Sequence, residues 1–274
     1  MRFEAAIVDL DGTLLLPDGT VGEETKRVLS SLKRKGIPVM VATGRPLFGA
    51  LQAVKGLEVH PLLAAFNGCL IHDLDTSSTV REFLLPWSLA GSLRLKLEDM
   101  GTDHIVYTGE ERLIRIVRHE DVGRKLELGL HKARRVEADH AWPQRPLPRI
   151  SFFGDPDHHG SLVSEIRAHP GIYVEQFPFS AFTGFQDSTL EFVEIMPACR
   201  GKAEILEDIE SRLGIAAEKV VAFGDHINDV PLLKKVGKAF AVANASPECL
   251  AQAHDIIPSN QEEGVASTLE RLFL

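Results

Sequence analysis

The chain begins with the feature that most constrains its fold, a short apolar run that ends in two carboxylates separated by a single residue. The run from Ala5 to Val8 does not alternate between polar and apolar residues, which is typical of a strand buried on both faces of a parallel sheet. Such a strand delivers the next residues to the carboxyl edge of the sheet, where open α/β sheets bind ligands. Asp9 and Asp11 follow it, and in an extended chain their side chains would point the same way. We expect these two carboxylates to form a reaction centre.

The stretch around Gly12 has two other interpretations, an ordinary structural turn and the start of a calcium loop. An Asp-x-Asp-Gly sequence is also common at an ordinary turn after a strand, because Asp and Gly are turn formers and glycine permits a turn that a side chain would obstruct. A calcium loop can begin with the same pattern, but it needs further oxygen ligands and a closing Glu. The residues from Leu14 to Pro17 supply none of these ligands, which argues against calcium. The choice between a structural turn and a catalytic pair therefore depends on the rest of the chain.

The composition is that of an ordinary folded protein and disfavours several classes. The chain has 274 residues, 44% hydrophobic and 25% charged, enough to bury a large core in one or two domains. Its net charge of -9 disfavours nonspecific binding to nucleic acid or to an acidic membrane, and no apolar run is long enough to cross a bilayer. The chain starts without a basic and apolar leader, and its 3 cysteines have no metal-binding spacing. We expect a cytoplasmic protein with neither a nucleic-acid nor a membrane partner.

Strand and helix patterns alternate at both ends of the chain, which predicts an α/β fold with a parallel, Rossmann-like core sheet. After the first strand, the expected strands of this core span residues 37–42, 62–66, 219–223 and 239–242. The expected helices span residues 23–35, 203–213, 230–236 and 264–272. An Asn-Gly turn signal at residues 67–68 accompanies an expected hairpin of residues 69–72 with 80–84.

The middle of the chain follows a different pattern. Here strand patterns follow one another directly as well as alternating with helices, which predicts an inserted α+β cap domain with an antiparallel sheet. Its expected strands span residues 104–107, 113–117, 149–153, 172–177 and 190–195, and its expected helices residues 87–100, 121–130 and 159–169. Residues 131–148, rich in charge and proline, are expected to form an exposed connection. The predicted domains are a catalytic core of residues 1–85 and 196–274 and a cap of residues 86–195.

Polar residues follow several of the predicted core strands. Asp9 and Asp11 follow the first strand, Thr43 follows the second, and a carboxylate-rich loop of residues 224–229 follows the strand at 219–223. Parallel strands would bring these residues to one edge of the sheet, where Lys202 at a helix start can also point. Carboxylates without nitrogen or sulfur ligands suit a hard cation, Mg²⁺ above all. A magnesium and carboxylate site with lysine and hydroxyl donors suits a phosphate group.

These segments resemble, in sequence and in order, the four motifs of the haloacid dehalogenase superfamily of phosphohydrolases. The motifs are Asp9-Leu10-Asp11-Gly12-Thr13, Thr43-Gly44-Arg45, Lys202, and Gly224-Asp225-x-x-Asn228-Asp229. The large insertion and the Asn67-Gly68 hairpin resemble the Cof-type branch, whose members are mostly phosphatases of sugar phosphates and other small metabolites. The resemblance covers essentially the whole chain, and it implies that the cap selects the substrate.

The resemblance also implies a role for each motif residue. Asp9 would attack phosphorus and form an aspartyl-phosphate, while Asp11 would protonate the leaving oxygen and later activate water. Thr43 and Lys202 would hold the phosphoryl oxygens. The other residues implied in phosphate or substrate binding are Leu10, Gly44, Arg45 and Asn228. The implied Mg²⁺ ligands are Asp9, the backbone carbonyl of Asp11, Asp225 and Asp229, the last acting through water or by orienting its neighbours.

The third motif leaves two candidates for its cation. Relatives often have Lys-Gly-x-Ala here, which would place Arg200 on the lysine position, whereas counting back from the end of the following helix selects Lys202. We prefer Lys202, because it stands at the helix start and because a compact ammonium fits between a carboxylate and a phosphate better than a planar guanidinium does.

Three functions agree with these motifs. The first is a Mg²⁺-dependent phosphatase acting on a small phosphorylated metabolite, and we favour it. The second is a phosphomutase or phosphotransferase that keeps the phosphate in its product, and the third is a non-enzymatic binding protein of the same fold. A binding protein would usually have lost the nucleophile or a metal ligand, but Asp9, Asp11 and Asp225 are all present. The sequence indicates neither the substrate nor the oligomeric state.

Overall fold

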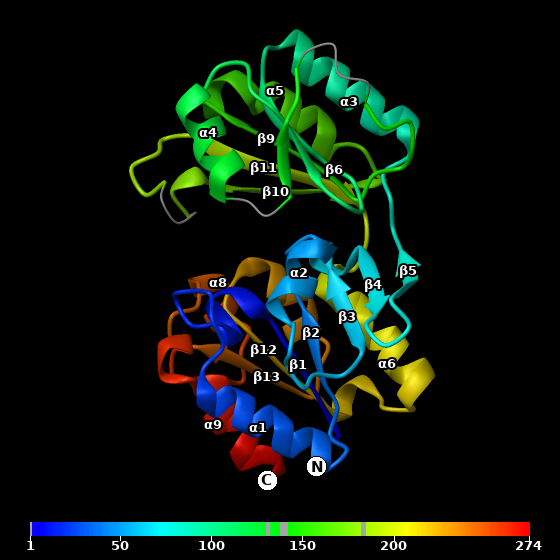
Figure 1. Cartoon of the computed structure of the whole chain (residues 1–274), viewed down its shortest axis with the longest axis vertical. Helices are drawn as coiled ribbons and strands as arrows, with labels where there is room; N and C mark the ends of the chain where they lie inside the picture. Colours follow the sequence, from blue (N-terminus) through cyan, green and yellow to red (C-terminus); the bar gives the residue numbers. More distant parts are fainter. Residues whose placement is uncertain (1, 130–131, 138–141, 182–184) are drawn as a thin grey trace. The chain divides into compact units, whose positions relative to one another are not determined.

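The computed structural model describes residues 2–129, 132–137, 142–181 and 185–274, and the chain divides into two compact units (Figure 1). Unit 1 comprises Met1–Glu82 and Arg200–Leu274, and unit 2 comprises Phe83–Cys199. The predicted cap limits, residues 86 and 195, lie within a few residues of the ends of unit 2.

The sheet of unit 1 has the order β14-β13-β12-β1-β2-β3-β4-β5 in the described part of the chain. Its strands are β1 (Ala5–Val8), β2 (Val39–Ala42), β3 (Leu62–Ala65), β4 (Leu70–Asp73), β5 (Ser78–Glu82), β12 (Val220–Gly224), β13 (Lys238–Val242) and β14 (Asp255–Ile257). The strands from β14 to β3 are parallel, and β4 and β5 continue the sheet in antiparallel pairing. Because β1 lies between β12 and β2, the residues that follow these three strands emerge at one edge.

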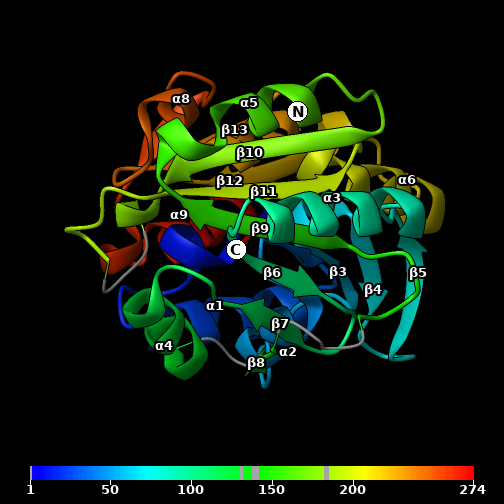
Figure 2. The same cartoon turned by 90° about the horizontal axis from the view of Figure 1, so that it is seen from above.

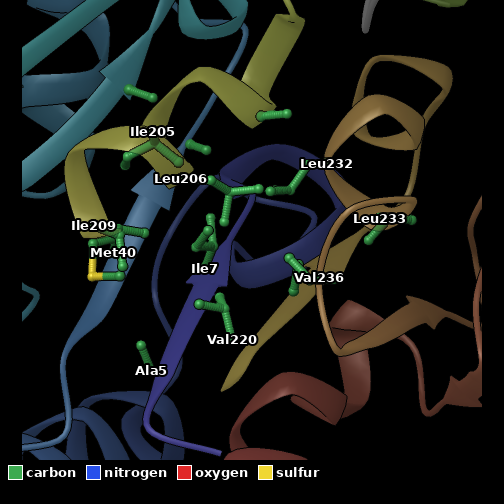
Figure 3. Close-up of a cluster of buried hydrophobic side chains, with 14 of the residues drawn as sticks. Ala5, Ile7, Met40, Ile205, Leu206, Ile209, Val220, Leu232, Leu233 and Val236 are labelled. Carbon is green, nitrogen blue, oxygen red and sulfur yellow. The ribbon is translucent and has the colours of Figure 1, made fainter. Parts of the chain in front are cut away.

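Helices cover the sheet of unit 1. They are α1 (Glu23–Arg34), α2 (Leu47–Ala53), α6 (Ile205–Leu213), α7 (Val230–Leu233), α8 (Pro247–Leu250) and α9 (Gly264–Phe273). Ile7 of β1, Ile205 of α6 and Leu232 of α7 belong to one buried apolar cluster, shown in Figure 3. Helices α1 and α9 lie side by side (Figure 1). Short helical turns carry the residues of the sheet edge: η1 (Leu10–Leu14), η2 (Phe66–Gly68), η4 (Gly201–Glu204) and η6 (Ile227–Asp229).

Unit 2 is built on a second sheet of order β10-β11-β9-β6-β7-β8, antiparallel except for the pair β7 and β8. Its strands are β6 (Asp103–Tyr107), β7 (Arg112–Arg115), β8 (Ala133–Arg135), β9 (Arg149–Gly154), β10 (Ile172–Pro178) and β11 (Glu191–Pro197), and its helices are α3 (Trp87–Asp99), α4 (Glu120–Gly129) and α5 (Pro156–Arg167). Figure 2 shows α3 and α5 over the same face of this sheet. Leu97 of α3, Phe152 of β9 and Ile166 of α5 share one buried cluster there.

The predicted fold class, a parallel α/β core with a second α+β sheet, is confirmed. The predicted pairing of residues 69–72 with 80–84 corresponds to β4 and β5, whereas the Asn67-Gly68 turn joins β3 to β4. In unit 1, helices α2 and α8 and strand β14 were not predicted. Helix α7 also ends at Leu233, earlier than predicted.

The prediction of a plain exposed connection over residues 131–148 is wrong. Strand β8 pairs in parallel with β7, and Leu147 forms an isolated bridge with Leu85. Val136 and Trp142 are also buried. The prediction rested on the charge of the segment. The segment's arginines Arg134 and Arg135 instead lie on the edge strand β8 and form ion pairs with glutamates of unit 2. Residues 131 and 138–141 lie outside the described part of the chain.

Candidate active site

Asp9 stands directly after the central strand β1. All four residues of β1 are buried, and the strand pairs in parallel with β12 and β2. The Asp9 backbone N–H donates to the carbonyl of Phe223 at 3.2 Å, so Asp9 continues the pairing toward β12. The residue is 5% exposed. The sheet therefore holds this carboxylate at its carboxyl edge, largely away from water.

Lys202 brings a cation to Asp9. The lysine is completely buried, and its Nζ lies 2.7 Å from Oδ1 of Asp9 and 2.6 Å from Oδ1 of Asp229. The other oxygen of Asp229 accepts hydrogen bonds from the backbone N–H groups of Asp225 and His226, each at 3.0 Å. Asp229 thus fixes both the ammonium group and the loop that follows β12.

The turn after β1 is tied to the loops that follow β12 and β13. Oγ1 of Thr13 donates to Oδ1 of Asp225 at 2.9 Å, and Nδ2 of Asn244 donates to the carbonyl of Gly12 at 2.8 Å. Gly12 has a φ of +75°, and a Cβ there would lie 2.4 Å from Oδ2 of Asp225. Only glycine fits this turn without displacing the carboxylate.

Three carboxylates form a group whose donor set fits a divalent cation. Asp9, Asp225 and Asp229 each offer an oxygen, and these oxygens lie within 4.8 Å of one another. Burial raises the pKa of Asp9 well above its ordinary value although Lys202 lowers it, and burial together with Asp229 raises the pKa of Asp225 to about 6. Burial opposes the charge of Lys202, but Asp229 and Asp9 outweigh it and raise the pKa of the lysine. One ammonium balances only one of three carboxylates, and an all-oxygen set suits Mg²⁺.

Asp11 lies outside this group of three. The chain is not extended after Asp9, because it turns through η1 with Leu10 buried in the core, so the period-two argument for the two carboxylates does not apply. The side chain of Asp11 is 58% exposed. Arg45 donates to both of its oxygens, from Nε at 2.7 Å and from Nη2 at 2.6 Å. This bidentate pair gives Asp11 a defined orientation.

The ends of β2 and β3 meet the loop after β12. Thr43 is completely buried, and its Oγ1 accepts a hydrogen bond from the backbone N–H of Arg45 at 3.2 Å. Nδ2 of Asn228 donates to Oδ1 of Asn67 at 3.0 Å. A Cβ on Gly44 would lie 2.9 Å from the same Asn67 oxygen, so glycine permits this close approach.

The structure separates the two cation candidates of the third motif. Lys202 contacts Asp9, as described above. Arg200 is instead 49% exposed at its side chain and forms ion pairs with Glu204 and Glu207. Of the two, Lys202 is the one that contacts Asp9.

Three residues at this edge were given no site role from the sequence. Thr13 lay inside the first motif, and its contact with Asp225 depends on a fold that brings distant segments together. Asn67 was interpreted only as part of a turn. Asn244 follows β13. Because residues that follow parallel strands gather at one edge of the sheet, its position in the sequence could have identified it as a site residue.

A family model for haloacid dehalogenase-like hydrolases matches residues 6–269. The chain belongs to this family. The predicted resemblance to superfamily phosphohydrolases of the Cof-type branch, and with it the prediction of a phosphoric monoester hydrolase, is confirmed. Within the described residues, no helix of this hydrolase is both long and apolar enough to span a membrane.

Several known proteins resemble this family member over nearly their whole length. The HMP-PP phosphatase of Klebsiella pneumoniae (strain 342) is 28% identical over 252 residues, which cover 90% of this chain and 86% of that protein. A haloacid dehalogenase-like hydrolase from Bacteroides thetaiotaomicron has a TM-score of 0.81 at 24% identity, covering 99% of this chain and 100% of the other. The phosphatase-superfamily protein BT1666 of the same organism also has a TM-score of 0.81, at 18% identity, covering 99% of this chain and 95% of that one. The two structures support the fold.

Proposed function

We propose that this hydrolase removes phosphate from a small phosphorylated metabolite, with a sugar phosphate as the first candidate, and that it uses Mg²⁺ and the nucleophile Asp9. The observation that carries the proposal is the 2.7 Å contact of buried Asp9 with buried Lys202 inside a group of three carboxylates. A carboxylate repels a phosphate dianion, so attack requires positive charge placed beforehand at this point. The ammonium group of Lys202 meets that requirement.

Two carboxylates divide the chemistry. An oxygen of Asp9 attacks phosphorus, the bond from phosphorus to the leaving oxygen breaks, and Asp11 donates a proton to that oxygen. In the second step Asp11 takes a proton from water, the water oxygen attacks phosphorus, and the bond to Asp9 breaks. Phosphate leaves, and both carboxyl groups return to their starting states. Arg45 binds both oxygens of Asp11 and favours its charged form, so this ion pair has to open for Asp11 to carry the proton that it donates in the first step.

The remaining site residues hold the phosphoryl group. We assign its oxygens to Lys202 and Thr43, and the further contacts of phosphate and substrate to Leu10, Gly44, Arg45 and Asn228. Because Asp229 and Asp9 fix the ammonium group before substrate arrives, the charge needs little reorganisation during the reaction. Most of the rate enhancement then comes from positioning and charge neutralisation.

The group of three carboxylates would hold the metal. We assign Asp9, Asp225, Asp229 and the backbone carbonyl of Asp11 to Mg²⁺, with Asp229 acting through water or by orienting its neighbours. The bound cation would supply positive charge against the phosphoryl oxygens. No zinc-type ligand is part of this donor set, because all of its atoms are oxygens.

The substrate is a small molecule in this proposal. One relative is an HMP-PP phosphatase, so HMP-PP belongs in the test beside sugar phosphates. The net charge of -9 argues against a nucleic-acid or membrane partner. The chain has only three cysteines, Cys69, Cys199 and Cys249, scattered along the sequence, which agrees with the reducing cytoplasm that we propose as its location.

The proposal is tested by phosphate release from a panel of sugar phosphates, nucleotides, HMP-PP and p-nitrophenyl phosphate. The wild type should release phosphate from at least one compound with Mg²⁺, and the matched Asp9→Asn variant should not. Analysis of the organic product separates hydrolysis from transfer, because a mutase keeps its phosphate in the product. A wild type that binds panel compounds without converting any of them would contradict the proposal.

A further inference from the structure

Lys202 reaches Asp9 from the short turn η4, and five charged side chains of unit 1 surround the end of that turn. We call this group the arginine–carboxylate clamp, which consists of Arg81, Arg200, Glu204, Glu207 and Asp208. A turn of four residues has few internal hydrogen bonds of its own, so its position depends on what holds its ends.

Glu204 closes the turn from within. It is the last residue of η4, lies two positions after Lys202 and is 2% exposed. Its Oε1 accepts hydrogen bonds from the backbone N–H of Arg200 at 2.7 Å and from the Nε of Arg200 at 3.1 Å, and its Oε2 accepts from Nη2 at 2.6 Å. The residues on both sides of Lys202 are thereby joined.

Arg81 ties the same turn to the sheet. From β5 its Nη2 donates to the backbone carbonyl of Glu204 at 2.7 Å and to Oδ2 of Asp208 at 2.6 Å, while Nη1 donates to Oε2 of Glu207 at 2.8 Å. A planar guanidinium can make these contacts together, whereas an ammonium group offers a single point charge. Arg81 therefore fixes the end of η4 and the first turn of α6 to the edge strand.

The clamp occupies both points where the chain crosses between the units. Unit 1 ends at Glu82, just after Arg81, and resumes at Arg200. Glu207 binds the arginines of both crossings. On its other side η4 is tightly packed, because a Cβ on Gly68 would lie 2.1 Å from the carbonyl of Gly201.

We propose that Arg81 is a positioning residue for the phosphatase reaction, which acts through Glu204 and η4 to hold the ammonium group of Lys202 between Asp9 and Asp229. This inference rests on the proposed function, because it assigns Arg81 an effect on phosphoryl transfer. Arg81 itself acts on the backbone of η4, so its loss should affect the chemical step more than substrate affinity.

Steady-state kinetics with p-nitrophenyl phosphate and Mg²⁺ provide the first test. Arg81→Gln should lower kcat by about tenfold or more, the scale for a small misplacement of a catalytic group. KM should change by less than about twofold, and Arg81→Lys should recover part of kcat. The control is Arg27→Gln on α1, which also removes an arginine paired with two glutamates but lies on a different part of unit 1. It should retain wild-type kinetics, and equal losses in the two Gln variants would overturn the inference.

A double-mutant cycle separates positioning from general damage. If Arg81 acts through Lys202, Arg81→Gln should cause little further loss of kcat/KM when added to Lys202→Ala. A structural role elsewhere predicts that the two losses multiply, and that result would overturn the inference.

Amide hydrogen exchange gives a readout that does not depend on turnover. Exchange of residues 200–204 should be faster in Arg81→Gln than in the wild type and in Arg27→Gln, at a temperature at which all three proteins remain folded. Unchanged exchange in this segment would refute the clamp even if the protein proved inactive. A wild type that releases no phosphate, with fast exchange in Arg81→Gln, would instead refute the proposed function while leaving the clamp as a device that orders Lys202.

Discussion

Both units bury charged side chains, but they balance those charges differently. In unit 2, Glu194 of β11 is paired with Arg149 of β9 at 2.5 Å, and Asp103 of β6 accepts hydrogen bonds from the backbone N–H groups of Val117, Arg118 and His119. In unit 1, two carboxylates of the candidate site, Asp9 and Asp229, share one lysine, and a third carboxylate, Asp225, lies beside them. Buried charge without a full set of partners costs stability, so its retention points to chemistry.

The positions of the two sets explain this contrast. The charges of unit 1 stand just beyond the ends of parallel strands, where segments distant in the sequence meet at one edge. Glu194 lies inside β11 and is matched by Arg149 on the neighbouring strand β9, and Asp103 at the start of β6 is matched by the backbone of the segment that follows β7. The unmatched charge of unit 1 and the matched charge of unit 2 should therefore respond differently to the same kind of substitution.

The largest effect should come from Asp9→Asn. The amide keeps the volume of the side chain but is a poor nucleophile, so kcat should fall by at least about 10⁴-fold. Stability of the metal-free protein should stay the same or rise, because one of several crowded carboxylates loses its charge. Steady-state kinetics check the loss of kcat, and thermal unfolding checks the stability. A clear loss of stability would show that the charge of Asp9 is matched, as the charges of unit 2 are.

Chelation should be nearly as severe. EDTA should reduce phosphate release to background, Mg²⁺ should restore it, and Ca²⁺ should restore it poorly because its larger, looser shell does not enforce the required geometry. The measurement is activity after dialysis and readdition of each metal. Full activity after exhaustive chelation would mean that the three carboxylates do not bind a cation that the reaction needs.

Lys202→Ala should cost on the order of 3 kcal/mol of transition-state stabilisation, about a hundredfold in kcat, the scale for losing one preorganised donor. Arg200→Ala is the matched comparison, since Arg200 stands two positions away and is 49% exposed at its side chain. Its effect on kcat should be smaller, because Arg200→Ala keeps Lys202, the backbone hydrogen bond from Arg200 to Glu204, and the contacts of Arg81 with η4 and α6. A larger loss for Arg200→Ala would show that the lysine was wrongly chosen.

Asp103→Asn should reverse the pattern of Asp9→Asn. The amide nitrogen would face backbone N–H donors that the carboxylate now satisfies, so unfolding of unit 2 should become easier by about 2 kcal/mol or more. Below the unfolding temperature, kcat should remain within about twofold of wild type. If Asp103→Asn kept its stability but lost most of its kcat, the contrast between matched charge in unit 2 and unmatched charge in unit 1 would be wrong.

The smallest effect concerns pH. Burial, with His158 nearby, lowers the pKa of His159 in unit 2 from 6.5 to about 4. The folded state therefore binds fewer protons than the unfolded state between these values, so stability should fall as pH drops from about 6.5 toward 4. His159→Gln, which cannot titrate there, should weaken this dependence in thermal unfolding measured across that range. An unchanged pH dependence would show that His159 is not its source.

Much of the fold could be predicted because apolar strands and amphipathic helices have local signatures. The run Ala5–Val8 and the helix at residues 23–35 show this clearly, and the order of motifs after the strands led to the site. Helix α2 was missed because it is short, follows Pro46 and contains Gly49. Strand β14 was missed because it has only three residues, and Ile256 within it is exposed.

The missed parts of the site depend on tertiary structure. Asn67 meets Asn228 across 161 positions of sequence, and the turn signal of Asn67-Gly68 explained the residue without that contact. A turn after Asp9 was expected, but the side chains of Asp9 and Asp11 were expected to point the same way on the assumption of an extended chain, which ignored η1. The clamp contact of Arg81 with Glu204 could not be predicted because both residues are ordinary charges in the sequence.

The most direct test of the account is to trap the covalent intermediate on Asp9. Wild-type protein is mixed with p-nitrophenyl [³²P]phosphate and Mg²⁺, quenched in acid within one turnover, digested and mapped. Label should appear on the peptide that contains Asp9, should be released by hydroxylamine as expected of an acyl phosphate, and should be absent from Asp9→Asn. Label on another residue, or a burst of the phenol product without any labelled peptide, would contradict the assignment of Asp9 as the nucleophile.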